Sequence, residues 1–313
     1  MADRCRTVRA IAWPRHEEWY DGEWRGTSVV KVYDIEIPDP RKIAELIAEI
    51  AQAQILPRFR CLAEGEWREK GPGDIVTVAD EEAEAALTPR LQSLLPGSVV
   101  LGEEAAAADP SLMDLLRKHQ PVWIIDPVDG TANFAAGKSD FCSMLALVSG
   151  DRLLAGWIHE PITGRTTMAV VGQGVEILGG PLDRTLPDPI DGKLRGVVAV
   201  GHRGKEDLAR RATAVRAKID QVRSLRCAGL DYLRLAAGDL DFLLFSGVMP
   251  WDHAAGALIT HESGGLAGYL GNDGDYIASA AITAEGVLAA TRPEVWHHVA
   301  ATLAGGSTEA AMA

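Results

Sequence analysis

The sequence predicts a layered fold of mixed α+β and α/β class, in which mixed β-sheets lie between helices. Helix-like and strand-like segments alternate from about residue 38 to near the end of the chain. Three consecutive apolar segments between residues 142 and 171 also have the length and composition of neighbouring strands. The 313 residues suffice for two small domains or one large layered unit, so a sizeable core needs no disulfide bonds.

The first half of the chain begins with a helix and then alternates. The helix is expected after Pro40 and up to about Phe59, because apolar side chains recur at helical spacing at Ile43, Leu46, Ile47, Ile50 and Ala51. A mobile, glycine-bearing loop is expected at residues 63–74. The next expected elements are a strand at 75–78, a helix at 81–95, and strands at 98–101 and 122–125.

Antiparallel strands are expected at 142–148, 153–159 and 165–171, because the residues at 161–164 favour a turn between the last two. The second half is expected to contain strands at 197–200, 242–245 and 287–290, and helices at 205–219, 230–237, 252–263 and 293–303. We therefore expect an N-terminal extension at residues 1–35, an N-terminal α+β half at 36–190 and a C-terminal α/β half at 191–313. The extension shows no sustained period of 2 or 3.6.

Composition narrows the class of function. Hydrophobic residues make up 47% of the chain and charged residues 24%, as in an ordinary globular protein. A net charge of -13 repels nucleic-acid backbones, although carboxylates that first bind divalent cations can still receive an anionic substrate. Four widely spaced cysteines with no Cys-x-x-Cys argue against a zinc ribbon. With no long apolar stretch near the N-terminus, we expect no membrane span, reduced thiols and a cytoplasmic protein.

The segment at 123–131 carries the strongest chemical signal. An apolar strand ends at Asp126, Pro127 fixes a turn, and Asp129 is expected back on the same side before Gly130 and Thr131 open a short helix. Carboxylate oxygens are ligands that Mg²⁺ prefers, and backbone N–H groups at a helix start suit a phosphate. This segment therefore predicts a site for a divalent cation and a phosphate.

Further acids lie at other element boundaries. Glu103 and Glu104 follow one predicted strand, Asp80 follows another, and Asp252 stands at the start of a predicted helix. Taken singly, an Asp-x-x-Asp pair is usually a turn, a Glu-Glu pair a solvated surface, and an Asp at a helix start a cap. It is their combination and order that favour one shared cleft.

In that combination the chain resembles the inositol monophosphatase family of the lithium-sensitive, magnesium-dependent phosphatases. The matching motifs are Asp-Pro-Val-Asp-Gly-Thr at 126–131, Gly-Glu-Glu at 102–104 and Trp-Asp-His-Ala-Ala-Gly at 251–256, and the resemblance spans about 37–303. It implies an αβαβα sandwich and Mg²⁺-dependent hydrolysis of a small phosphate monoester by water, most closely an inositol-1-phosphate-like one. It also implies a homodimer.

The resemblance assigns roles to individual residues. Two Mg²⁺ ions, with a third and weaker one near Glu103 also known in the family, would be held by Glu103, Asp126, the carbonyl of Val128, Asp129 and Asp252. Asp80 and Thr131 would orient and deprotonate the water, with Glu103 counted among the catalytic residues and Glu104 behind it. Substrate contacts would come from Asp129, Gly130, Thr131, Gly229, Phe245 and Asp252. Lys70 matches the family's mobile loop lysine loosely, in a loop one residue shorter.

Two positions depart from the family pattern. Phe245 stands where a glutamate commonly accepts a hydrogen bond from a substrate hydroxyl, and Ala132 replaces the second threonine of Gly-Thr-Thr. The substrate therefore stays open among inositol phosphate, fructose 1,6-bisphosphate, histidinol phosphate and a 3'-phosphonucleotide. Arg203, Arg223 and Arg226 are candidates for a second anionic group. A non-catalytic role as a regulatory partner is the remote alternative.

Overall fold

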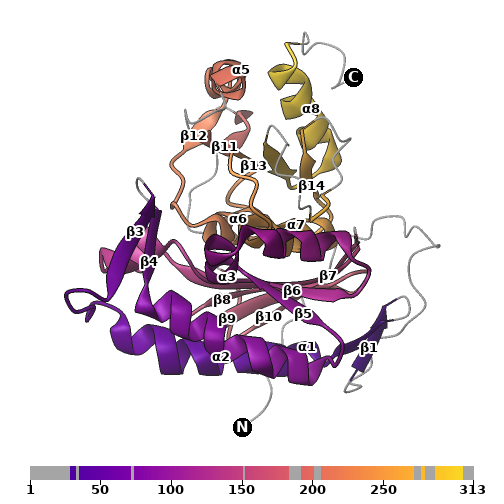
Figure 1. Ribbon diagram of the computed structural model, residues 1–313. Helices are drawn as coiled ribbons and strands as arrows, with labels where there is room; N and C mark the ends of the chain where they lie inside the picture. The colour runs from indigo at the N-terminus through magenta and orange to yellow at the C-terminus, as the bar shows by residue number, and fades with distance from the viewer. Residues whose placement is uncertain are drawn as a thin grey trace.

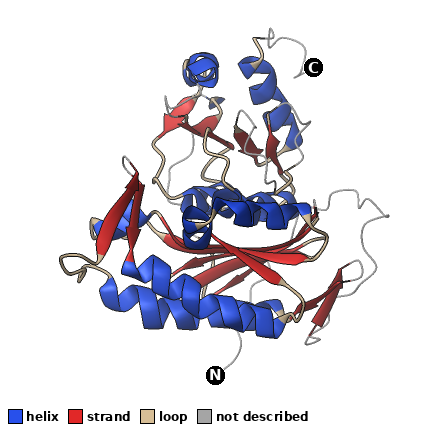
Figure 2. Ribbon diagram, viewed as in Figure 1, coloured by secondary structure: helices blue, strands red, loops and turns tan. Residues whose placement is uncertain are grey.

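The computed structural model describes residues 29–32, 35–71, 74–150, 152–182, 192–200, 206–270, 276–278 and 286–305. Helices and sheets alternate through the molecule as an αβαβα sandwich (Figures 1 and 2). From bottom to top in Figure 1, a pair of long helices is followed by a sheet, a second helix pair, a second sheet and a third helix pair. The fold class predicted from the sequence is confirmed.

The lower helix layer consists of α1 (Pro40–Ile50) and α2 (Val78–Leu94). The Asp39 side chain accepts from the Arg41 N–H at the start of α1, and the helix continues as a π-helix (Ala51–Ile55) and a 3-10 turn (Leu56–Arg58). At the start of α2, Thr77 and Asp80 form a reciprocal capping box. The cap fixes Asp80 in the first turn of α2.

The first sheet has the described strand order β10-β9-β8-β7-β6-β5. Its strands are β5 (Val99–Gly102), β6 (Pro121–Asp129), β7 (Cys142–Ser149), β8 (Arg152–Glu160), β9 (Arg165–Val170) and β10 (Gly174–Leu178). β5 and β6 pair in parallel and the other neighbours pair antiparallel, so the sheet is mixed. The pairing of Gly102 with Ile125 brings the ends of β5 and β6 to one edge.

The middle layer contains α6 (Ala228–Ala236) and α7 (Pro250–Glu262). α7 contacts β6 to β10 on one side and β14 (Leu266–Tyr269) and β15 (Val287–Ala290) on the other, so it is apolar nearly all round and almost wholly buried. A Cβ on Gly156 of β8 would lie 2.9 Å from the Cα of Ala255. A glycine at that position therefore lets α7 lie directly on the first sheet.

The second sheet has the described order β12-β11-β13-β15-β14. Its strands are β11 (Arg195–Ala199), β12 (Asp220–Val222), β13 (Phe242–Phe245), β14 (Leu266–Tyr269) and β15 (Val287–Ala290), and its outer face is covered by α5 (Glu206–Arg216) and α8 (Pro293–Leu303). Three groups of buried apolar side chains fill the spaces between the layers of the described chain.

Shorter elements complete the described chain. β1 (Val29–Val32) pairs with β2 (Ile35–Pro38), and β3 (Trp67–Gly71) pairs with β4 (Asp74–Thr77). α3 (Glu103–Ala108) and a 3-10 helix (Pro110–Arg117) follow β5, and α4 (Thr131–Ala135) follows β6. Most of the predicted extension at 1–35, including 1–28, lies outside the described residues.

Two sequence-based expectations are wrong in detail. The segment expected to be a loop at residues 63–74 contains strand β3, which forms a hairpin with β4. Trp67 and the charged residues after it are exposed or half-exposed, so no buried face marks the strand. The strand expected at 122–125 extends to Asp129 through an irregular pairing with β7. The sequence pattern does not predict strands β10, β12 and β14.

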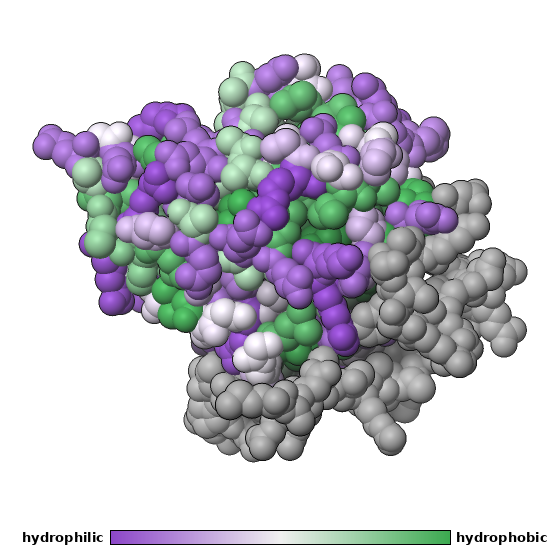
Figure 3. Space-filling view, turned by 90° about the horizontal axis from the view of Figure 1, so that it is seen from below, coloured by the Kyte–Doolittle hydropathy of each residue, from purple (hydrophilic) through white to green (hydrophobic). Residues whose placement is uncertain are grey.

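The face seen from below mixes hydrophilic and hydrophobic residues over the part that is not grey (Figure 3). Ion pairs on the helices of this layer, such as Arg90 with Glu49 and Arg58 with Glu82, account for some of its charge. Among the described helices, none has both the length and the apolar character needed to cross a membrane.

Candidate active site

Asp126 and Asp129 lie at the end of β6, where the strand departs from regular pairing. The register with β7 shifts between these two residues, so Pro127 and Val128 stand outside the ladder. The Ser143 hydroxyl donates to the Pro127 carbonyl at 2.7 Å and holds this bulge in place. The Asp126 and Asp129 carboxylates therefore flank a single β-bulge that a hydrogen bond holds in place.

Glu103 comes to the same place from the neighbouring strand. It begins α3 directly after β5, one residue beyond the pair formed by Gly102 and Ile125. The Glu84 carboxylate of α2 accepts from the N–H groups of Glu104 and Ala105, each at 2.9 Å. This carboxylate therefore anchors the start of α3, and with it Glu103.

The acids form one electrostatic group. Burial raises the pKa of Asp126 well above its ordinary value, and the charges of Glu103, Asp129, Asp252 and Asp80 raise it further. Asp252, at the start of α7, has its pKa raised by burial and then by Glu103 and Asp129. The structure thus brings together Asp80, Glu103, Asp126, Asp129 and Asp252, which come from α2, α3, β6 and α7.

This group fits a hard divalent cation. The Oδ1 atom of Asp126 is buried and has no hydrogen-bond partner. Carboxylates that burial and mutual repulsion disfavour as anions are stabilised by a cation among them. Oxygen-only ligands of this kind suit Mg²⁺ or Ca²⁺ better than a thiophilic metal.

Asp80 and Thr131 are in contact. The Thr131 hydroxyl lies 3.1 Å from Oδ1 of Asp80 and 2.8 Å from the Val128 carbonyl. The other oxygen of Asp80 accepts from the N–H and hydroxyl of Thr77. Burial raises the pKa of Asp80 to about 7, despite the opposing hydrogen bonds from Thr77. Asp80 can therefore exchange a proton near neutral pH.

Gly130 turns the chain between β6 and α4. Its φ of 88° lies in the left-handed region, and a Cβ there would approach the Asp140 carbonyl to 2.8 Å. Only glycine fits both conditions. The turn sets Thr131 at the first position of α4, beside Asp80.

Lys70, at the tip of the β3–β4 hairpin, reaches the acids. Its ammonium lies 2.7 Å from Glu103, 3.0 Å from Glu104 and 3.8 Å from Asp74. Burial opposes its charge, yet the carboxylates of Glu103 and Glu104 raise the pKa of Lys70 overall. For Glu104, burial raises the pKa to about 7 even though Lys70 opposes the shift.

The residues predicted to contact the substrate do not all lie beside the acids. The Gly229 N–H donates to Oδ2 of Asp129 at 2.6 Å, so Gly229 joins the site through Asp129. Phe245 is only 7% exposed and packs against Tyr232 and His253. Arg223 and Arg226 are exposed, and Arg203 lies outside the described residues.

Sequence reasoning missed two groups beside the acids. One is Glu84, whose contact with α3 depends on how α2 packs. The other is the pair Cys142 and Cys227, whose sulfur atoms lie 3.5 Å apart and both approach Asp129. Burial raises the pKa of Cys142 to about 11. The two cysteines are 85 positions apart in the sequence, so no spacing signal links them.

Comparisons with known proteins identify the family of the chain. The model of the inositol monophosphatase family matches residues 38–306. The chain is 32% identical over 203 residues to inositol monophosphatase 1 of Solanum lycopersicum, covering 63% of this chain and 72% of the relative. It is 32% identical over 232 residues to the inositol-1-monophosphatase of Mycobacterium leprae, covering 70% and 78%.

A solved structure, an IMPase of Thermotoga maritima, superposes with a TM-score of 0.66 at 23% identity, covering 85% of this chain and 96% of that one. This likeness supports the fold. Fold and sequence together define a hydrolase of the phosphatase class. The chain belongs to the inositol monophosphatase family.

Proposed function

We propose that this chain is a Mg²⁺-dependent phosphatase that hydrolyses a small phosphate monoester, most closely one like inositol 1-phosphate. The observation that carries the proposal is the buried carboxylate group around Asp126, whose Oδ1 has no partner. A group of acids this close is costly without compensating positive charge. Its presence beside the turn at Gly130 and Thr131 favours a cation site that receives a phosphate.

The residues that would hold Mg²⁺ are Glu103, Asp126, the Val128 carbonyl, Asp129 and Asp252, for two ions and a third, weaker one near Glu103. Bound there, Mg²⁺ would polarise the phosphoryl oxygens and lower the pKa of a coordinated water. The Lys70 ammonium lies 2.7 Å from the Glu103 carboxylate, so a cation bound by Glu103 would weaken this ion pair and with it the contact of the β3–β4 hairpin with the site.

Asp80 and Thr131 are proposed to position the attacking water. Thr131 is held between Asp80 and the Val128 carbonyl, which fixes its hydroxyl oxygen. The Thr131 hydroxyl lies 3.1 Å from Oδ1 of Asp80, so Asp80 is placed to accept a proton through Thr131; without metal, burial raises the pKa of Asp80 to about 7. The backbone N–H groups of Gly130 and Thr131 would bind the phosphate.

The substrate beyond the phosphate is the finer part of the proposal. An inositol phosphate is favoured by the family, while fructose 1,6-bisphosphate, histidinol phosphate and a 3'-phosphonucleotide remain alternatives. We also propose a cytoplasmic homodimer that binds neither nucleic acid nor membrane. The net charge of -13 is consistent with the exclusion of nucleic acid.

The test is turnover of a panel of phosphomonoesters with and without Mg²⁺, for wild type, Asp126→Asn and Asp114→Asn. Asp114 is an exposed acid that pairs with Arg117, so it serves as the matched control. We expect Mg²⁺-dependent turnover in wild type and in the control, and a loss of roughly 100-fold or more in Asp126→Asn, because a neutral amide weakens the whole cation site. Turnover that needs no divalent cation, or an Asp126→Asn enzyme near wild-type activity, would contradict the proposal.

A further inference from the structure

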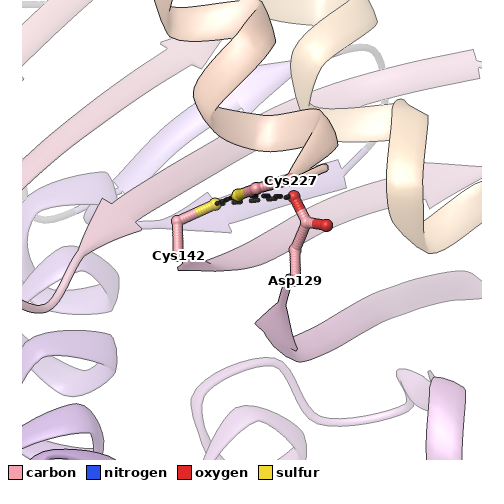
Figure 4. A group of neighbouring side chains, drawn as sticks. All are labelled: Asp129, Cys142 and Cys227. Carbon is pink, nitrogen blue, oxygen red and sulfur yellow. Dashed lines mark hydrogen bonds between the residues drawn. The ribbon is translucent and has the colours of Figure 1, made fainter. Parts of the chain in front are cut away.

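A second group of potential metal ligands adjoins the acid group and shares Asp129 with it. The Sγ atoms of Cys142 and Cys227 and the Oδ2 atom of Asp129 point toward one another from β7, from the residue before α6 and from β6 (Figure 4). The sulfur atoms are 3.5 Å apart and lie 3.7 Å and 3.2 Å from Oδ2. Among the described residues, these three ligand atoms all lie within 4.8 Å of one another, which is close enough to share one ion.

The spacing of the three atoms matches a tetrahedral thiolate site. Zn²⁺ lies about 2.3 Å from sulfur and about 2.0–2.2 Å from a carboxylate oxygen. Two such ligands at a tetrahedral angle are therefore separated by about 3.5–3.8 Å. The observed separations, from 3.2 to 3.7 Å, require shifts of only a few tenths of an ångström.

Backbone features hold the three ligands in place. Cys142 is the register partner of Asp129 in the pairing of β6 with β7, so their side chains are neighbours in the sheet. The Gly229 N–H fixes Oδ2 at 2.6 Å. A Cβ on Gly229 would lie 2.4 Å from the Cys142 sulfur, so the glycine leaves room for the thiol. β6, β7 and the start of α6 thus position the three ligands, and Gly229 leaves the space that they need.

The ligand type separates this set from the acid group beside it. Thiolate ligands select Zn²⁺ and similar thiophilic ions, whereas the carboxylates around Asp126 suit Mg²⁺. A disulfide would involve only the two sulfur atoms. It would also remove the thiol protons that both cysteines donate to Oδ2 of Asp129. The carboxylate as third member therefore favours a metal over a disulfide.

We propose that Cys142, Cys227 and Asp129 form a binding site for a thiophilic divalent cation such as Zn²⁺, and that occupation of this site inhibits the enzyme. Two metal–sulfur bonds form as two thiol protons leave to solvent, and a fourth position stays open for water. The inhibition rests on the proposed function, because Asp129 would be shared with the Mg²⁺ site. Zn²⁺ binding by itself does not depend on that function.

Binding is tested on the full chain with Co²⁺, a spectroscopic substitute for Zn²⁺, in the presence of excess Mg²⁺. Wild type is expected to bind one ion and to develop the near-ultraviolet charge-transfer band of thiolate-bound cobalt, which added Zn²⁺ removes. Cys142→Ser and Cys227→Ser are expected to lose the band and to bind at least about 10-fold more weakly. Cys61→Ser, which changes an exposed thiol, is the matched control and is expected to behave as wild type.

Cys227→Ala serves as a second variant, because a small apolar side chain suits this buried position if the serine disturbs folding. A thermal unfolding curve for each variant shows that it is folded. A cobalt–thiolate band that persists in a folded Cys227→Ala would overturn the proposal. So would a Cys142–Cys227 disulfide in the protein isolated without reductant, detected by mass spectrometry.

Inhibition is measured separately, as loss of phosphomonoester turnover on adding Zn²⁺ at fixed Mg²⁺. We expect inhibition in wild type and in Cys61→Ser, relief by a chelator, and an inhibitory concentration at least about 10-fold higher in Cys227→Ala. An enzyme that turns over substrate but gives no band refutes this site alone. A protein that gives the band but hydrolyses no phosphomonoester refutes the proposed function and leaves the metal site standing.

Discussion

Phe245 ends β13 inside a group of buried rings. Its ring centroid lies 5.8 Å from that of Tyr232 and 5.2 Å from that of His253. The Tyr232 hydroxyl lies 3.2 Å from Nδ1 of His253, and Nε2 of His253 lies 3.0 Å from the Gly247 carbonyl. Burial lowers the pKa of His253 to about 4, so the imidazole is neutral near pH 7. These rings support the start of α7, where Asp252 lies.

Phe245→Glu is expected to destabilise the protein by at least about 3 kcal/mol, because it removes a buried ring and places a carboxylate among apolar groups. Phe245→Leu, the control, keeps an apolar side chain and should cost less than half as much. Urea unfolding of the two variants measures the difference.

The family pattern alone leads to a different prediction for Phe245→Glu. If residue 245 faced the substrate, the new carboxylate would accept a hydrogen bond from a hydroxyl, and kcat/KM for inositol phosphate would rise relative to an aryl phosphate. A Phe245→Glu protein as stable as wild type and more active on inositol phosphate would show that position 245 faces the substrate. A destabilised variant with no such gain would show that Phe245 acts through packing.

At the scale of elements, the sequence predicts best where burial is continuous. β13, β15 and α8 have the predicted bounds, because each is an uninterrupted apolar run or a helix opened by a proline. β3 and β10 lack a fully buried face, so the alternation that reveals a strand is weak in them. The sequence pattern does not predict α3, because Glu103 and Glu104 directly follow an apolar strand and carry no helical period of their own.

The anchoring of α3 by Glu84 gives a prediction that no motif contains. Glu84→Gln should replace one of the two accepted hydrogen bonds by a clash of donors, at a cost of about 1–3 kcal/mol. Because α3 carries Glu103, the Mg²⁺ concentration for half-maximal activity should rise about 10-fold to 100-fold, with a smaller change in kcat at saturating Mg²⁺.

The matched control for Glu84→Gln is Glu82→Gln on the same helix, where the side chain is exposed and pairs with Arg58. It should change neither stability nor the Mg²⁺ requirement. If Glu84→Gln lowers the unfolding free energy but leaves the Mg²⁺ requirement unchanged, Glu84 supports the fold and does not position Glu103.

At the scale of the whole molecule, the candidate site belongs to no single layer. Its acids come from α2 in the lower helix layer, from β6 and α3 at the first sheet, and from α7 between the sheets. Sequence motifs were sufficient to name these acids. They could not name Cys142 and Cys227 as neighbours of Asp129, because the first contact needs the pairing of β6 with β7 and the second needs the packing of α6 on the first sheet.

The acid group also makes stability depend on pH and on Mg²⁺. Burial and mutual repulsion raise the pKa values of Asp126, Asp129 and Asp252, and burial raises that of Asp80 to about 7. In the unfolded chain these carboxyls lose their protons near pH 4, so between about pH 4 and 7 the folded state holds more protons. Without a divalent cation, this group therefore makes folding less favourable as the pH rises through that window.

Thermal unfolding with a chelator should accordingly give a lower Tm at about pH 8 than at about pH 5.5, by roughly 1–2 °C for each kcal/mol of lost stability in a chain of this length. Saturating Mg²⁺ should raise Tm more at the higher pH, because a cation binds the ionised carboxylates of the folded state only.

Asp126→Asn removes one repelling charge, so it should be more stable than wild type in chelator at about pH 8 and should lose most of the Mg²⁺ effect. Asp114→Asn should follow wild type in both respects. An Asp126→Asn protein that gains as much Tm from Mg²⁺ as wild type would place the cation elsewhere and separate the acid group from the proposed chemistry.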